Sequence, residues 1–146
     1  MKEITTHVEI TGHAERVWDV LTDFAAYGEW NTFIRRVSGD LRWGSRLSVQ
    51  IQPPGRRAMT FSPRITALVP NHELRWVGRV LMPGLFDGEH RFVIESLDPT
   101  RVRFVHSERF RGILVPLLWR GLAGPTKEGF KAMNKALKER VEKNPR

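Results

Sequence analysis

The sequence contains no cysteine. This absence excludes disulfide bonds, thiolate nucleophiles, iron–sulfur clusters and cysteine zinc sites, and it is typical of a reducing compartment. The longest apolar run, residues 113–119, is far shorter than the roughly 20 residues that cross a bilayer as a helix. The first six residues lack the apolar core of a secretory signal. A soluble, cytoplasmic protein is therefore expected. A glycine-rich phosphate loop and a nucleophile elbow are also missing from the sequence.

The composition is that of one folded domain. The chain has 146 residues, of which 40% are hydrophobic, with five tryptophans and eight phenylalanines. Because so many large apolar side chains can offset the entropy of ordering by burial, disorder is excluded as the main state, and residues 1–146 are expected to form a single domain. The formal net charge of +8 raises the question of an acidic partner, such as nucleic acid or a lipid surface.

Hydrophobic periodicity predicts the order of the elements. Alternation from Ile4 to Ile10 predicts a strand over residues 2–11, and helical spacing from Val17 to Phe24 predicts an amphipathic helix. A second short helix is expected to carry Tyr27 and Trp30. Further strands are expected over residues 34–39, 47–51, 59–67, 74–80, 86–95 and 101–110, with Pro63 as an interruption. A long C-terminal helix, starting near Pro116 and kinked at Gly124-Pro125, is expected to end the chain.

The last two expected strands place polar groups on an apolar face. On the first strand, His90 shares its face with Phe92, and on the second His106 and Glu108 share theirs with Phe104 and Phe110. If the pairing is symmetric about the turn at residues 98–100, Phe92 lies opposite His106 and His90 lies opposite Glu108. Two imidazoles and a carboxyl group are therefore predicted to point toward the interior.

The order of elements and several motifs resemble those of a known superfamily. The runs Val17-Trp18-Asp19-Val20-Leu21-Thr22-Asp23-Phe24, Trp30-Asn31-Thr32-Phe33-Ile34, Phe86-Asp87-Gly88-Glu89-His90-Arg91-Phe92 and Met133-Asn134-Lys135-Ala136-Leu137-Lys138 are similar to the polyketide cyclase/dehydrase and lipid-transport (SRPBCC) branch of the START/Bet v 1-like superfamily. This resemblance implies an α+β helix-grip fold: a curved, seven-stranded antiparallel sheet wrapped around the long C-terminal helix, with two short helices after the first strand. It also implies a hydrophobic cavity between sheet and helix.

The cluster of His90, His106 and Glu108 has two interpretations. A carboxylate near an imidazole in an apolar pocket can be poised for proton transfer near neutral pH, with His90 or His106 as general base and Glu108 orienting it. Alternatively, the three groups only satisfy one another's hydrogen bonds. Two histidines and a glutamate could also ligate a metal, but their spacing matches no metal motif, so neither a metal nor a cofactor is expected.

Aromatic and other inward side chains are expected to line the cavity and contact a ligand, although a stripe of this kind also serves as core packing. The predicted ligand-binding residues are Trp30, Phe33, Phe61, Trp76, Phe86, His90, Phe92, Phe104, His106, Glu108, Phe110, Phe130 and Met133.

Surface features carry weaker expectations. The arginines on the outer faces of the last strands have glutamates as cross-strand partners and no exposed aromatics beside them, so nucleic acid is not expected. Weak contact with an acidic membrane surface remains compatible with the charge. The apolar run at residues 111–119 is expected to pack beneath the sheet; if exposed, it is a cavity gate, a dimer contact or a membrane-touching loop.

Three functions follow. The leading one is the binding of a small hydrophobic ligand, such as a lipid or a polyketide-like molecule. Transport of this ligand is one form of this function. The second is a cyclase or dehydratase that uses the histidines and Glu108. The third is a partner-binding module without a small-molecule ligand. A monomer and a homodimer are both compatible with the sequence.

Overall fold

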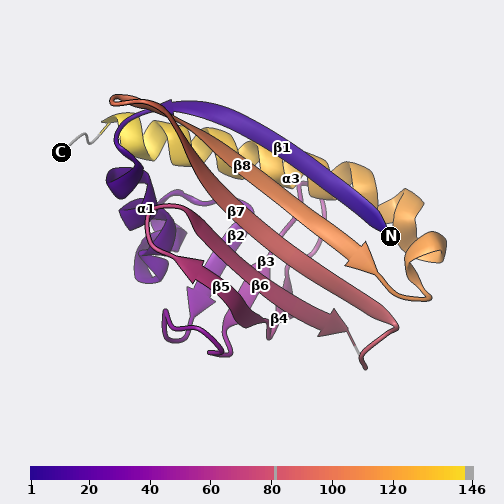
Figure 1. Ribbon diagram of the computed structural model, residues 1–146. Coiled ribbons are helices and arrows are strands. Elements are labelled where there is room, and N and C mark those ends of the chain that lie inside the picture. Colours follow the sequence, from indigo (N-terminus) through magenta and orange to yellow (C-terminus); the bar gives the residue numbers. More distant parts are fainter. Residues whose placement is uncertain (81, 144–146) are drawn as a thin grey trace.

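The computed structural model describes residues 1–80 and 82–143, which form an antiparallel α+β fold (Figure 1). In chain order, its elements are β1 (Lys2–Thr11), α1 (Ala14–Thr22), the 3-10 helix η1 (Phe24–Ala26), α2 (Tyr27–Trp30), β2 (Ile34–Ser38), β3 (Ser48–Ile51), β4 (Met59–Phe61), β5 (Arg64–Val69), β6 (Glu73–Val80), β7 (Phe86–Asp98), β8 (Arg101–Arg111) and α3 (Val115–Lys143). A long helix, α3, lies along a strongly twisted sheet, as in the expected helix-grip arrangement.

The strands form two sheets. Five strands pair in the order β1-β8-β7-β6-β5, and three pair in the order β2-β3-β4. The expected single sheet of seven strands is therefore divided, because the run over residues 59–67 forms two strands that pair with different partners. Pro63 lies at the division, where its missing amide hydrogen suits a break in the ladder. A bridge between Arg46 and Arg64 joins the two sheets locally.

The register between β7 and β8 confirms the prediction. His90 lies opposite Glu108, and Phe92 lies opposite His106. The pairs that face inward along these strands alternate with outward pairs such as Glu95 and Arg103, whose side chains form an ion pair at 3.8 Å. The two-residue period of the strands thus places both imidazoles on the face that α3 covers.

Helix α3 runs without interruption through Pro125, and its predicted apolar stripe is buried. The stripe consists of Phe130, Met133, Leu137 and Val141. Gly129 adds a close contact beside this stripe, because a Cβ atom there would overlap the ring of Phe33. The absence of a side chain at Gly129 lets the aromatic ring lie directly against the helix backbone.

Two glycines of α3 are expected to respond in opposite ways to replacement by alanine. Gly129→Ala forces the ring of Phe33 to move and is expected to lower the free energy of unfolding by about 1–3 kcal/mol. Gly121→Ala places its methyl group in open space and is expected to raise that free energy by up to about 1 kcal/mol through helix propensity. Urea unfolding of both variants tests this; equal effects of the two changes contradict the packing described.

Candidate functional site

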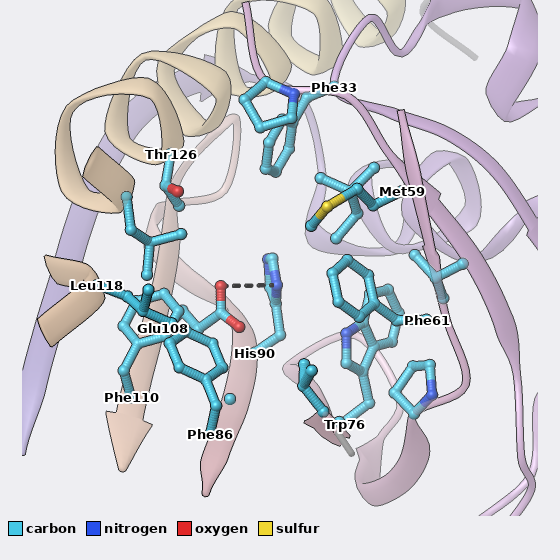
Figure 2. Close-up of a pocket in the computed structure, with 18 of the residues that line it drawn as sticks. Phe33, Met59, Phe61, Trp76, Phe86, His90, Glu108, Phe110, Leu118 and Thr126 are labelled. Atoms are coloured by element: carbon cyan, nitrogen blue, oxygen red, sulfur yellow. Dashed lines mark ion pairs between the residues drawn. The ribbon is translucent and has the colours of Figure 1, made fainter. Parts of the chain in front are cut away.

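A cavity of about 370 Å³ lies between α3, the five-stranded sheet and the β3–β4 hairpin (Figure 2). Its lining is almost entirely apolar. The polar exceptions among the lining residues are Thr126, His90 and Glu108. The other lining residues are Phe33, Val49, Ile51, Pro53, Met59, Phe61, Pro63, Trp76, Gly78, Val80, Phe86, Gly88, Phe110, Leu114, Leu118 and Leu122.

The position of the cavity follows from the inward pairs of β7 and β8. The Gly88–Phe110 pair and the His90–Glu108 pair line it, whereas the next inward pair, Phe92–His106, does not. Beyond His90, the buried stripe of α3 packs against the sheet, and the ring of Phe130 stacks on His106 with centroids 4.0 Å apart. The cavity therefore occupies the end of the sheet that the N-terminal half of α3 covers.

The structure separates the predicted ligand-binding residues into two groups. Those that line the cavity are Phe33, Phe61, Trp76, Phe86, His90, Glu108 and Phe110. Those outside the lining are Trp30, Phe92, Phe104, His106, Phe130 and Met133. Of this second group, all but the half-buried Trp30 are fully enclosed in the core. A ligand in this cavity meets the first group directly and the second group only through other side chains.

A chain of buried polar groups runs from the cavity wall to β1. Asn134 Nδ2 donates to Thr6 Oγ1 at 2.8 Å. The other side-chain atom of this amide, Asn134 Oδ1, is therefore an acceptor, and Nδ1–H of His106 donates to it at 3.0 Å. A neutral His106 then has its lone pair on Nε2, where it accepts from Nε2–H of His90 at 2.6 Å. The lone pair of His90 is consequently on Nδ1, 3.6 Å from Oε1 of Glu108.

Both imidazoles are held in the neutral state. Burial lowers the pKa of His106 to about 3, although its hydrogen bond with Asn134 acts in the opposite direction. Burial also lowers the pKa of His90 well below its usual value, and the neighbouring His106 adds to that effect. Neither ring therefore carries a positive charge at neutral pH, and the proximity of Glu108 does not make a permanent ion pair.

Glu108 lines the cavity beside His90 and is the lining group whose protonation changes near neutral pH. Its side chain is 17% exposed, and burial raises its pKa to about 8, so the carboxyl group is mostly protonated at pH 7. Gly88 makes room for this group, because a Cβ atom there would overlap Oε2 of Glu108. Figure 2 shows the carboxyl group beside His90, with Phe86 and Phe110 next to it. A protonated acid in an apolar wall can donate a hydrogen bond or a proton to a bound molecule.

His90 and His106 are placed to form a hydrogen bond with each other. The two Nε2 atoms are 2.6 Å apart, which leaves no room for an ion between them. Within residues 1–80 and 82–143, no group of three or more histidine, aspartate or glutamate side chains is placed to hold a metal ion. The trio considered from the sequence is therefore linked by hydrogen bonding and close polar contact rather than by a metal geometry.

Sequence reasoning missed Thr6 and Asn134, which complete the buried chain. The available signal was Asn134 itself, a polar residue within the apolar stripe of Phe130, Met133 and Leu137. It also missed Thr126, which lies one α3 turn before Phe130 and points into the cavity (Figure 2).

The expectation that residues 111–119 pack beneath the sheet is wrong for part of that run. Val115 is buried. Ile113 and Leu117, however, are 75% and 77% exposed, and Leu118 is partly exposed as well. The first turn of α3 presents its other face to solvent, because a helix that lies on a sheet buries only one side.

Comparison with known proteins identifies the family. The family model described as polyketide cyclase / dehydrase and lipid transport matches residues 1–142. The chain belongs to this family. Family and fold together indicate a ligand-binding or cyclase-like domain. Among curated proteins, no match is found. No helix in the described part of this family member has the length and apolar character needed to cross a membrane.

Solved structures show the same fold at low sequence identity. A START superfamily protein from Mycobacterium smegmatis shares 23% identity, covers 97% of each chain and gives a TM-score of 0.72. Norcoclaurine synthase from Thalictrum flavum, solved with dopamine and hydroxybenzaldehyde, shares 12% identity over 99% of this chain and 88% of its own, with a TM-score of 0.73. The Zhui aromatase/cyclase from Streptomyces shares 16% identity over 96% and 95%, with a TM-score of 0.67. At these identities the likeness concerns the fold, which is the expected helix-grip fold.

Proposed function

We propose that this protein binds a small, mostly apolar molecule in the cavity and that Glu108 makes the directional polar contact to it. The observation that carries the proposal is the lining: a volume of about 370 Å³ is surrounded by apolar side chains, with its ionisable lining groups, His90 and Glu108, paired on one wall. This volume lies within the range of about 300–1,000 Å³ that is usual for small-molecule pockets.

The chemistry of the wall indicates the class of ligand. Flat aromatic side chains such as Phe61 and Trp76 favour a planar or aliphatic guest, and burial of its apolar surface contributes about 25 cal/mol per Å². A permanently charged ligand is disfavoured, because the neutral imidazoles and the protonated acid offer it no opposite charge. A neutral molecule with one hydroxyl or carbonyl group fits this wall best.

Calorimetric titration with 2-naphthol, a neutral planar alcohol, tests the proposal. One molecule is expected to bind per chain, with a negative heat-capacity change from apolar burial. Its methyl analogue, 2-methylnaphthalene, is expected to bind about fivefold more weakly, since it cannot pair with Glu108. The proposal is contradicted if neither compound shows saturable binding, or if several molecules bind per chain.

A second function, proton transfer of the cyclase or dehydratase type, is favoured by the raised pKa of Glu108 in an apolar wall. For this function, Glu108 would exchange a proton with the carbonyl group of the bound molecule. His90, whose Nδ1 lies 3.6 Å from Oε1 of Glu108, would orient the carboxyl group. His106 lies outside the lining and acts only through His90.

The two functions are separated by incubating a metabolite extract with wild type or Glu108→Gln and comparing masses before and after. New masses that form only with the wild type support catalysis. Unchanged extracts, together with retained 2-naphthol binding, support a carrier.

A further inference from the structure

One end of the molecule carries exposed apolar side chains beside the cavity. The β6–β7 turn and the β8–α3 connection lie side by side there, since Ile113 N donates to the carbonyl of Gly84 at 3.1 Å (Figure 1). Met82 on the first connection is 58% exposed. Ile113 on the second connection and Leu117 in the first turn of α3 are each exposed by about three quarters. We name Met82, Ile113, Leu117 and Leu118 the mouth patch, because Leu118 also lines the cavity.

Two segments at this end of the molecule carry an excess of basic side chains. The segments 52–63 and 109–127, which contribute lining residues to the cavity, hold six basic side chains and no acidic one. The basic residues are Arg56, Arg57, Arg109, Arg111, Arg120 and Lys127. Outside these two segments, the chain has eighteen basic and sixteen acidic side chains, so most of the net charge of +8 belongs to them.

Some of these basic side chains have partners within the protein, and others have no carboxylate partner. Arg56 Nη2 donates to the carbonyl of Gly121 at 3.4 Å, which holds the β3–β4 loop beside the start of α3. Arg109 is paired with Glu3 at 2.7 Å, but within the described part of the chain no carboxylate pairs with Arg111 or Arg120. The ammonium group of Lys2 lies 5.8 Å from the ring centroid of Trp119, which brings a further cation to the same end.

From this geometry we propose that the mouth patch docks on an anionic phospholipid bilayer, with the apolar side chains inserted at the interface and the arginines on the headgroups. Apolar side chains within a basic border match the two layers of such a surface, acyl chains below and phosphates above. A second copy of the chain is a poorer occupant, because a two-fold contact places the same cationic border against itself. Docking here brings the cavity mouth to the membrane, and it requires no ligand in the cavity.

Vesicle flotation tests this docking with full-length protein. Wild type is expected to float with vesicles of phosphatidylcholine and phosphatidylglycerol in a ratio of 7:3 and to stay in solution with pure phosphatidylcholine. Leu117→Asp is expected to reduce the partition coefficient about tenfold, and Arg120→Gln about fivefold.

Two matched changes at the opposite end of the sheet are the controls. Val69→Asp alters an exposed apolar residue at the end of β5, and Arg103→Gln alters a basic residue near the start of β8. Both are expected to bind vesicles as the wild type does.

Three results overturn the proposal. The first is no flotation of the wild type, and the second is equal binding to vesicles with and without phosphatidylglycerol. The third is a dimer in sedimentation velocity that Leu117→Asp dissociates, with no binding of the protein to vesicles. Because titration with 2-naphthol is a separate measurement, failure here leaves the ligand-binding proposal standing, and the converse also holds.

Discussion

Raising the pH from 6.5 to 8 is expected to lower the free energy of unfolding by about 1 kcal/mol, because the loss owing to Glu108 exceeds a smaller gain from the two buried histidines. The folded protein holds the pKa of this carboxyl group at about 8, well above its ordinary value of 4.5. Between these two values, the folded state binds more protons than the unfolded state, so stability falls as the pH rises. At pH 6.5 each of these histidines still binds about half a proton in the unfolded chain, so the gain from them is largest just above this pH. Above about pH 7.5 they are largely neutral in both states, and the effect of Glu108 is seen almost alone.

The histidines produce the opposite slope below pH 6.5. Their pKa values are lowered in the folded state, so the unfolded chain binds more protons as the solution becomes acidic. Each imidazole that stays neutral contributes a loss of up to about 1.4 kcal/mol per unit of pH. Between pH 4.5 and 6.5, Glu108 opposes this loss in part. A stability maximum is therefore expected near pH 6.5.

Urea unfolding followed by tryptophan fluorescence from pH 4.5 to 8.5 measures this profile. Glu108→Gln is expected to remove the decline between pH 6.5 and 8. Glu95→Gln, on the outward face of β7, is the matched control and is expected to keep the decline. Parallel profiles for wild type and Glu108→Gln above pH 6.5 would show that Glu108 is not a buried acid.

Filling the cavity with Thr126→Trp is expected to weaken 2-naphthol binding at least tenfold. Thr126 points into the cavity from α3, so an indole there occupies the space of the ligand (Figure 2). The free energy of unfolding is expected to change by less than about 1.5 kcal/mol, because the new side chain fills an existing space instead of displacing packed atoms.

Lys127→Trp provides the comparison for this change. The neighbouring Lys127 is exposed, so a tryptophan there adds the same ring outside the cavity. Calorimetric titration of both variants is the measurement. Unchanged binding by Thr126→Trp, or equal loss in both variants, is incompatible with a ligand in this cavity.

The inward polar groups could be predicted because strand geometry is periodic. Once the turn at residues 98–100 was assigned, the pairing of His90 with Glu108 followed from counting along two strands. The same counting could not predict which inward pairs are open. Phe86 and Phe104 both face inward, yet Phe86 lines the cavity and Phe104 is enclosed in the core. That difference depends on how closely the side chains of α3 pack against each part of the sheet, which is a tertiary property.

The titration behaviour was also beyond the sequence. Residue types alone placed a carboxylate beside imidazoles in an apolar pocket, an arrangement compatible with proton transfer near neutral pH or with hydrogen bonding alone. Burial instead favours the uncharged form of every member: it lowers the pKa of His90 and His106 and raises that of Glu108. Asn134 further determines which nitrogen of His106 carries the proton, and its role required the approach of α3 to β1.

Two-dimensional NMR of methyl-labelled protein titrated with 2-naphthol tests most directly whether a small apolar molecule enters this cavity. Saturable shifts are expected for the methyl groups of Met59, Leu118 and Leu122, which line the cavity, and unchanged signals for Leu137 and Val141, which pack in the core. Shifts limited to the exposed methyl groups of Met82 and Leu117, or no shifts at any of these positions, would contradict it.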